Sequence, residues 1–221
     1  YLLEKFKTAG ITKAFLVIKD GKWDIPNYFR EGDLVGLSLA YLVIAGSLGP
    51  PDTLDRAYPF LAQKRVAFGF PDILFGPDDA YVRLIQRQEE TGADVVLGLH
   101  LIEDPRVWDM VDCDEEGRIH ALVMKPASTT LTYGWCCAVW TPVFTDFLHR
   151  FLRADETKRN LDRLASKAND PSGDLAVGIV LQAAMKAGLV MQSVKFPGAC
   201  YLDIGTPENL LKAVRECYQP E

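Results

Sequence analysis

Two patterns of apolar and polar positions follow one another through the first half of the chain. Short apolar runs typical of buried β-strands are separated by segments in which apolar residues recur every three to four positions, as in amphipathic helices. The expected strands are KAFLVI, LSLAYLVI, RVAFGF and ADVVLGLHLI, and the expected helices are YLLEKFKTAG, WDIPNYF, PPDTLDRAYPFL and PDDAYVRLIQRQEETG. Strands that alternate with helices of this length predict a mainly parallel sheet covered by helices on both faces.

The pattern changes after about residue 105. The segment VWDMVDCDEEGRIHALVMK contains two β-like runs around a polar turn, which predicts a hairpin. A further strand is expected over YGWCCAVW, and helices over TPVFTDFLHRFL and LAVGIVLQAAMKAG. The charged segment RADETKRNLDRLASKANDPSGD between those helices is expected to be an exposed helix or loop. We therefore predict a single α/β domain over residues 1–221, with a β-rich insertion.

The C-terminal stretch YLDIGTPENLLKA places an acidic residue in an unusual position. Asp203 ends a strand-like run, a tight turn at Gly205 follows, and Pro207 occupies the first turn of a helix. Asp72 has a comparable place after RVAFGF. In open α/β sheets ligands bind beyond the carboxyl ends of the strands, and Mg²⁺ takes oxygen ligands. The alternative, favoured for either residue on its own, is that each Asp caps a turn or helix.

Composition and charge narrow the function classes. With 221 residues, 48% of them hydrophobic, the chain can bury a sizeable core. The net charge of −6 and the lack of a basic stripe argue against a nucleic-acid partner. No apolar run approaches the ~20 residues needed to span a bilayer, so no membrane partner is expected. The five cysteines have an odd count and no CxxC spacing, which indicates reduced thiols in a cytoplasmic protein.

Several segments, in the order in which they occur, resemble the sugar-1-phosphate nucleotidyltransferases. This family joins a nucleoside triphosphate and a sugar 1-phosphate into a nucleotide sugar. SLGPPDTLDRA is similar to its Leu-Gly-Thr-Ala segment, which borders the nucleobase, and FGFPDILFG to its Gly-Asp metal motif. VDCDEEGRIHALVMKP resembles the hairpin that leads to Glu-Lys-Pro, and YLDIGTPENLLKA its second metal motif. The resemblance covers almost the whole chain.

The resemblance implies a mainly parallel, Rossmann-like nucleotidyltransferase sheet flanked by helices. Residues 1–104 would form the nucleotide-binding part, and residues 105–221 a sugar-phosphate-binding part that contains the β-hairpin. The implied partners are a nucleoside triphosphate, with UTP or dTTP favoured, and a sugar 1-phosphate. The implied cofactor is Mg²⁺. A homo-oligomer is among the states that the resemblance allows.

The resemblance also implies roles for single residues. Asp72 and Asp203 would hold the metal, and we expect their carboxylates to lie roughly 4–6 Å apart. Lys125 would contact the sugar phosphate during in-line displacement at the α-phosphorus, with pyrophosphate leaving. Gly49 and Asp52 would lie on the nucleotide side, where the missing side chain of the glycine lets the base approach the backbone. The alternatives are that Lys125 is a solvated lysine at a hairpin end and that Gly49 is only part of a turn.

Two departures from the family pattern keep other functions open. The glycine-rich loop with its Arg and Pro-Lys, which follows the central strand in the family, is absent from the sequence, and Met124 replaces the Glu before the lysine. We expect about 20–40 further residues before Tyr1, enough for a strand and a loop. One alternative is a non-catalytic binding or regulatory module of the same fold. The other is a nucleotidyltransferase for a non-sugar phosphate.

The histidines and the paired cysteines carry less functional signal. His100, His120 and His149 are scattered without metal-ligand spacing, and we expect surface or core roles for them. Cys136 and Cys137 lie in an apolar strand, where a buried packing role is expected.

Overall fold

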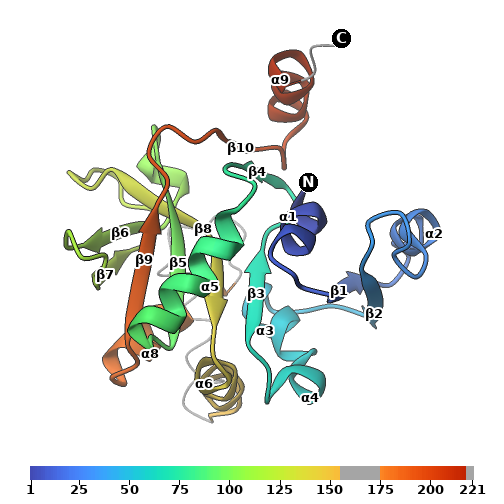
Figure 1. The fold of residues 1–221 in the computed structure, drawn as a ribbon, viewed down its shortest axis with the longest axis horizontal. Helices are drawn as coiled ribbons and strands as arrows, with labels where there is room; N and C mark the ends of the chain where they lie inside the picture. Colours follow the sequence, from blue (N-terminus) through green and yellow to red (C-terminus); the bar gives the residue numbers. More distant parts are fainter. Residues whose placement is uncertain (155–174, 218–221) are drawn as a thin grey trace.

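The computed structural model of the protein describes residues 1–154 and 175–217 (Figure 1). The charged segment expected to be an exposed helix or loop lies almost wholly outside the described residues. The helices are α1 (Leu2–Thr8), α2 (Asp24–Phe29), α3 (Pro50–Asp55), α4 (Tyr58–Leu61), α5 (Ala80–Thr91), the short 3-10 helix η1 (Pro105–Val107), α6 (Pro142–Arg153), α8 (Val177–Lys186) and α9 (Pro207–Cys217). The strands are β1 (Lys13–Lys19), β2 (Ser38–Ile44), β3 (Val66–Gly69), β4 (Ile73–Phe75), β5 (Val95–Leu101), β6 (Met110–Cys113), β7 (Ile119–Val123), β8 (Tyr133–Trp140), β9 (Met191–Lys195) and β10 (Tyr201–Asp203).

The largest sheet has six strands, of which β3, β5, β6 and β9 run in one direction and β7 and β8 in the other. Its order is β7-β6-β8-β5-β9, and β3 also pairs with β8. Because β8 is antiparallel to both β3 and β5, and β5 is parallel to β9, the strands β3, β5 and β9 run in one direction. The predicted hairpin is present as the antiparallel pair β6–β7 at one edge. The prediction of a mainly parallel α/β sheet with a hairpin is therefore confirmed.

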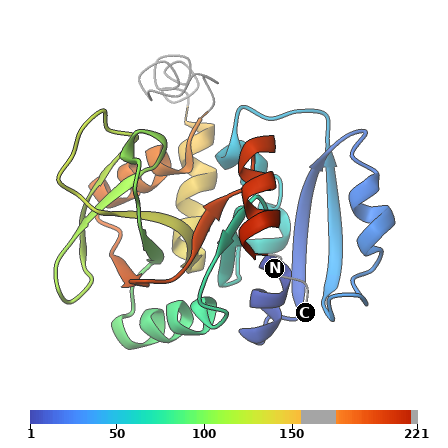
Figure 2. The same ribbon diagram turned by 90° about the horizontal axis from the view of Figure 1, so that it is seen from above.

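The strands β1 and β2 form a second, parallel sheet. Figure 2 shows β1, β2 and α2 together on one side of the molecule. Among the described residues, β1 pairs only with β2, and β3 only with β8. An aromatic contact links the second sheet to the helical layer, because the rings of Phe15 on β1 and Phe60 on α4 stack with their centroids 5.4 Å apart.

The core consists of two clusters on opposite faces of the six-stranded sheet. Leu97 and Leu99 of β5 face the cluster formed with α6 and α8, whereas Val96 faces the cluster formed with α1 and α5. The β5 strand is buried along almost its whole length. A strand covered on both faces is apolar at most positions, which explains the apolar run of β5, in which the buried His100 is the one polar residue.

A polar contact joins α1 to the loop before α5. The Lys5 side chain is only 6% exposed, and its Nζ lies 2.6 Å from Oδ1 of Asp78, whose side chain is 92% exposed. The hydrogen bond and the charge of Lys5 hold the pKa of the Asp78 carboxyl below its usual value. A depressed carboxyl pKa stabilises the fold above the unfolded pKa and loses this effect as the pH falls through the folded pKa.

We therefore expect Asp78→Asn to lower the free energy of unfolding by about 1 kcal/mol at pH 7, a modest cost because the carboxylate is exposed. The difference from the wild type should begin to shrink below about pH 4 and disappear as the pH falls through the lowered folded pKa, below which the carboxyl is protonated in both states. Urea unfolding at pH 7 and pH 3 measures the difference in the free energy of unfolding, with Asp79→Asn as the neighbouring control. An equal loss at both pH values would show that the ion pair is not its cause.

Candidate active site

A two-stranded antiparallel arm brings the two predicted metal aspartates to one end. β4 follows β3 after three residues, so the arm lies at the carboxyl end of that strand (Figure 1). The arm pairs β4 with β10, with Asp203 opposite Ile73. Asp72 immediately precedes β4, and its backbone oxygen accepts a hydrogen bond of 2.7 Å from the backbone N–H of Ile204. Residues some 130 positions apart in sequence thus become neighbours.

The two carboxylates share the space next to Gly205. A Cβ atom built on Gly205 would lie 3.0 Å from Oδ1 of Asp203 and 3.1 Å from Oδ2 of Asp72, so these oxygens are no more than about 6.1 Å apart. The backbone N–H of Gly205 donates to Oδ1 of Asp203 at 2.7 Å. A glycine suits this turn because any side chain would press on both carboxylates.

The chemistry of these donors fits a hard divalent cation. Asp72 is exposed and Asp203 half-buried, so the pair offers carboxylate oxygens on an accessible side of the arm. Within the described ranges, no group of three or more His, Cys, Asp or Glu side chains is arranged to hold a metal ion. Mg²⁺ commonly binds through one or two carboxylates and keeps water and phosphate oxygens as its other ligands. The arrangement therefore fits Mg²⁺ better than a closed zinc site.

The backbone at Lys125 adopts a conformation that is uncommon for a non-glycine residue. Its φ is +37°, in the left-handed region, and such conformations persist where the surroundings impose them. The Lys125 backbone N–H donates to the backbone oxygen of Trp108 at 3.1 Å. The Trp108 ring in turn meets the ring of Tyr201 on β10 edge-on, with centroids 4.6 Å apart. Two contacts thus connect the Lys125 segment to the arm that carries Asp203.

The first turn of α8 contacts residues on both ends of the β6–β7 hairpin. A Cβ atom on Gly178 would collide with Oδ2 of Asp109, so this carboxylate lies against the first turn of α8. Negative charge is favourable at a helix N-terminus. The side chain of Met124 approaches the same point, with its sulfur 3.4 Å away. Sequence reasoning missed Trp108 and Asp109, and their only signal was an aromatic-acidic pair at the start of the hairpin segment.

On the predicted nucleotide side, contacts within the chain account for the conformation of Gly49 and for the side chain of Asp52. Gly49 has a φ of +127°, and an added Cβ would lie 2.7 Å from the backbone N and 2.5 Å from the backbone O of Leu175. Oδ2 of Asp52 accepts hydrogen bonds from the backbone N–H of Leu48 at 3.0 Å and from Arg56 at 3.2 Å. In the structure the close approach at Gly49 is made by the chain itself, and Asp52 caps the turn before α3. Their roles toward a nucleotide stay predictions.

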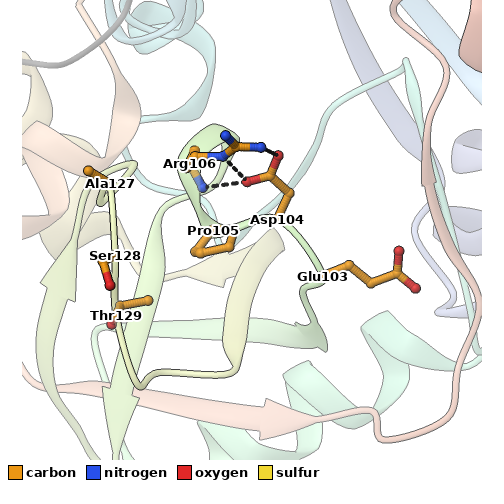
Figure 3. Close-up of a pocket in the computed structure, with 7 residues that line it drawn as sticks. All are labelled: Glu103, Asp104, Pro105, Arg106, Ala127, Ser128 and Thr129. Carbon is orange, nitrogen blue, oxygen red and sulfur yellow. Dashed lines mark hydrogen bonds and ion pairs between the residues drawn. The ribbon is translucent and has the colours of Figure 1, made fainter.

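A hollow of about 420 Å³ lies between the loop after β5 and the loop after β7 (Figure 3). The Arg106 guanidinium donates to both carboxylate oxygens of Asp104 at 2.8 Å, which lowers the pKa of that carboxyl. Among the described residues, Arg106 is the one arginine that lines the hollow, and its charge is already paired with that of Asp104. The hollow is lined by Glu103, Asp104, Pro105, Arg106, Ala127, Ser128 and Thr129. This lining contains neither metal aspartate nor Lys125.

The amino-acid sequence is similar to those of known proteins. A glucose-1-phosphate thymidylyltransferase of Streptomyces antibioticus is 24% identical over 216 residues, which cover 97% of this chain and 56% of that protein. The low-salt glycan biosynthesis nucleotidyltransferase Agl11 of Haloferax volcanii is 22% identical over 217 residues, covering 96% of this chain and 55% of that protein. The chain is thus similar over almost its whole length to known nucleotidyltransferases, among them one that acts on glucose 1-phosphate by its name. No protein-family profile matches it.

Solved structures show that the homology extends to the fold. The UDP-glucose pyrophosphorylase of Acinetobacter baumanii superimposes with a TM-score of 0.74 at 16% identity, covering 97% of this chain and 79% of that chain. This agreement confirms the predicted nucleotidyltransferase-like α/β fold.

The chain spans about half the length of the curated relatives it matches. None of the described helices is long and apolar enough to cross a membrane.

Proposed function

We propose that the protein transfers a nucleotidyl group from a nucleoside triphosphate to a sugar 1-phosphate, giving a nucleotide sugar and pyrophosphate. The observation that carries the proposal is the meeting of Asp72 and Asp203 beside Gly205. The homologues named above, all of them nucleotidyltransferases, support it. Residues 1–104 would bind the nucleotide and residues 105–221 the sugar phosphate. UTP or dTTP is the favoured donor.

The reaction needs positioning and charge neutralisation more than it needs a base. The sugar phosphate is already an anion, so its oxygen can attack the α-phosphorus without losing a proton to the protein. Bound divalent metal supplies charge stabilisation of the phosphate oxygens. Asp72 and Asp203 would hold that metal through their carboxylate oxygens. Lys125 would hold the acceptor phosphate in line, where a fixed geometry contributes much of the rate.

Release of pyrophosphate tests the proposal. The purified protein is incubated with Mg²⁺, each of the common nucleoside triphosphates, and a panel of sugar 1-phosphates that also includes an amino-alcohol phosphate. We expect pyrophosphate only when both substrates are present, with the largest yield from UTP or dTTP, and none after chelation of the metal.

Two other outcomes would replace the proposal. Binding of a nucleotide or sugar phosphate without pyrophosphate release under any condition would indicate a binding or regulatory module. Release with the amino-alcohol phosphate alone would indicate a nucleotidyltransferase for a non-sugar acceptor.

A further inference from the structure

His100, at the end of β5, is completely buried and makes two polar contacts. Its Nε2 lies 2.7 Å from the backbone oxygen of Gly76, and its Nδ1 lies 3.3 Å from Sγ of Cys136. A carbonyl oxygen can only accept, so Nε2 carries the proton and Nδ1 is the acceptor. Burial lowers the pKa of His100 and raises that of the Cys136 thiol, which keeps the ring neutral and the S–H available to donate. Both ring nitrogens are therefore satisfied.

The surroundings of His100 belong mainly to the arm and to the segment that leads into it. The ring centroid lies 5.7 Å from that of Phe75 on β4, 6.1 Å from that of Tyr201 on β10 and 5.3 Å from that of Phe196. An apolar side chain would pack in such a place without the cost of burying polar atoms. The polar ring instead directs one N–H at a single backbone oxygen of the arm.

That oxygen belongs to the residue that closes the arm. The backbone N–H of Gly76 donates to the backbone oxygen of Cys200 at 2.9 Å, which extends the β4–β10 pairing beyond Phe75. Both backbone polar groups of Gly76 are thus held, one by the partner strand and one by His100. The two aspartates occupy the other end of the same arm, about 10–13 Å further along at the rise of a β-strand.

We propose that His100 is a positioning residue that anchors the β4–β10 arm to β5 and thereby sets the separation of the Asp72 and Asp203 carboxylates. The role rests on the proposed function in one respect, namely that these carboxylates hold the metal. His100 does not reach the metal pair itself, and it acts through the backbone of Gly76. Loss of the anchor should loosen the arm and weaken the metal site while the rest of the sheet stays intact.

Three variants test the role. His100→Leu removes both polar contacts, and His100→Gln keeps an N–H near the position of Nε2. Leu97→Ala is the stability control, because Leu97 is also buried on β5 but faces the opposite core cluster. Hydrogen exchange without metal is followed in peptides covering residues 70–76 and 199–206. Binding of Mn²⁺ is followed by electron paramagnetic resonance in the presence of a non-reactive triphosphate analogue.

We expect amide exchange in the two arm peptides to be at least about tenfold faster in His100→Leu than in Leu97→Ala, and Mn²⁺ affinity to fall about tenfold, as for groups that orient metal ligands. His100→Gln should restore most of the exchange protection of the arm peptides and most of the Mn²⁺ affinity. The role is overturned if His100→Leu behaves like Leu97→Ala in the arm, or if His100→Gln is no better than His100→Leu. Should the wild type bind no Mn²⁺, the proposed function fails, while the exchange data still decide whether His100 anchors the arm.

Discussion

Replacing Asp203 by asparagine should lower Mg²⁺-dependent pyrophosphate release by roughly 10²–10³-fold, the loss typical when one preorganised electrostatic group is removed. The fold should survive, because an asparagine oxygen can still accept the 2.7 Å hydrogen bond from the Gly205 backbone N–H. What disappears is one negative charge beside Asp72. Steady-state kinetics over a range of Mg²⁺ concentrations, together with thermal unfolding, measure both effects.

Asp72→Asn and the double variant show whether the two residues act as one site. Groups that hold the same ion are strongly non-additive, so the double variant should be little worse than either single variant. Asp112→Asn, which removes an exposed carboxylate on β6, is the matched control and should leave turnover unchanged. Losses that simply multiply in the double variant would mean that the two aspartates work independently.

Replacing Lys125 by alanine should weaken use of the sugar phosphate by roughly 1.5–3 kcal/mol, or about 10- to 150-fold, the range for a charge-assisted hydrogen bond. Nucleotide affinity should change much less, because the lysine is expected to touch only the acceptor phosphate. The measurements are kcat/KM for the sugar phosphate and the dissociation constant of the nucleotide.

The unusual backbone at Lys125 calls for a second variant. At a φ of +37°, alanine keeps the conformational cost whereas glycine relieves it. If the ammonium group matters, Lys125→Gly and Lys125→Ala lose the same amount, and Lys125→Arg retains part of the activity. Equal losses for both substrates, or a loss that glycine restores, would assign the residue a backbone role instead.

The parts of the fold that could be predicted are those with a long and distinct sequence pattern. The helices α5 and α6 have enough residues for a clear period, β5 is marked by a nearly continuous apolar run, and the hairpin β6–β7 is marked by its polar turn. The reversed direction of β8 could not be predicted, because strand direction depends on connections in three dimensions. The pairing of β4 with β10 in the arm could not be predicted either. Each strand has only three residues, and the two strands come from distant segments of the chain.

Only those features of the candidate site that lie within a single sequence motif could be predicted. The motifs around Asp72 and Asp203 placed both residues at strand ends, but their shared contact with Gly205 depends on the register of β4 and β10. The hydrogen bonds of Asp52 lie within four residues, so its capping role was within reach of local reasoning. The contacts of His100 were not, because Gly76 and Cys136 come from distant parts of the chain.

The most direct test of the central claim is a crystal structure of the protein with Mn²⁺ and a non-reactive triphosphate analogue, with anomalous scattering recorded at the manganese edge. We expect an anomalous peak at about 2–2.5 Å from a carboxylate oxygen of Asp72 and from one of Asp203, with phosphate oxygens of the nucleotide as further ligands. A peak held by other residues, with the two carboxylates turned away from it, would contradict the shared metal site and with it the proposed mechanism.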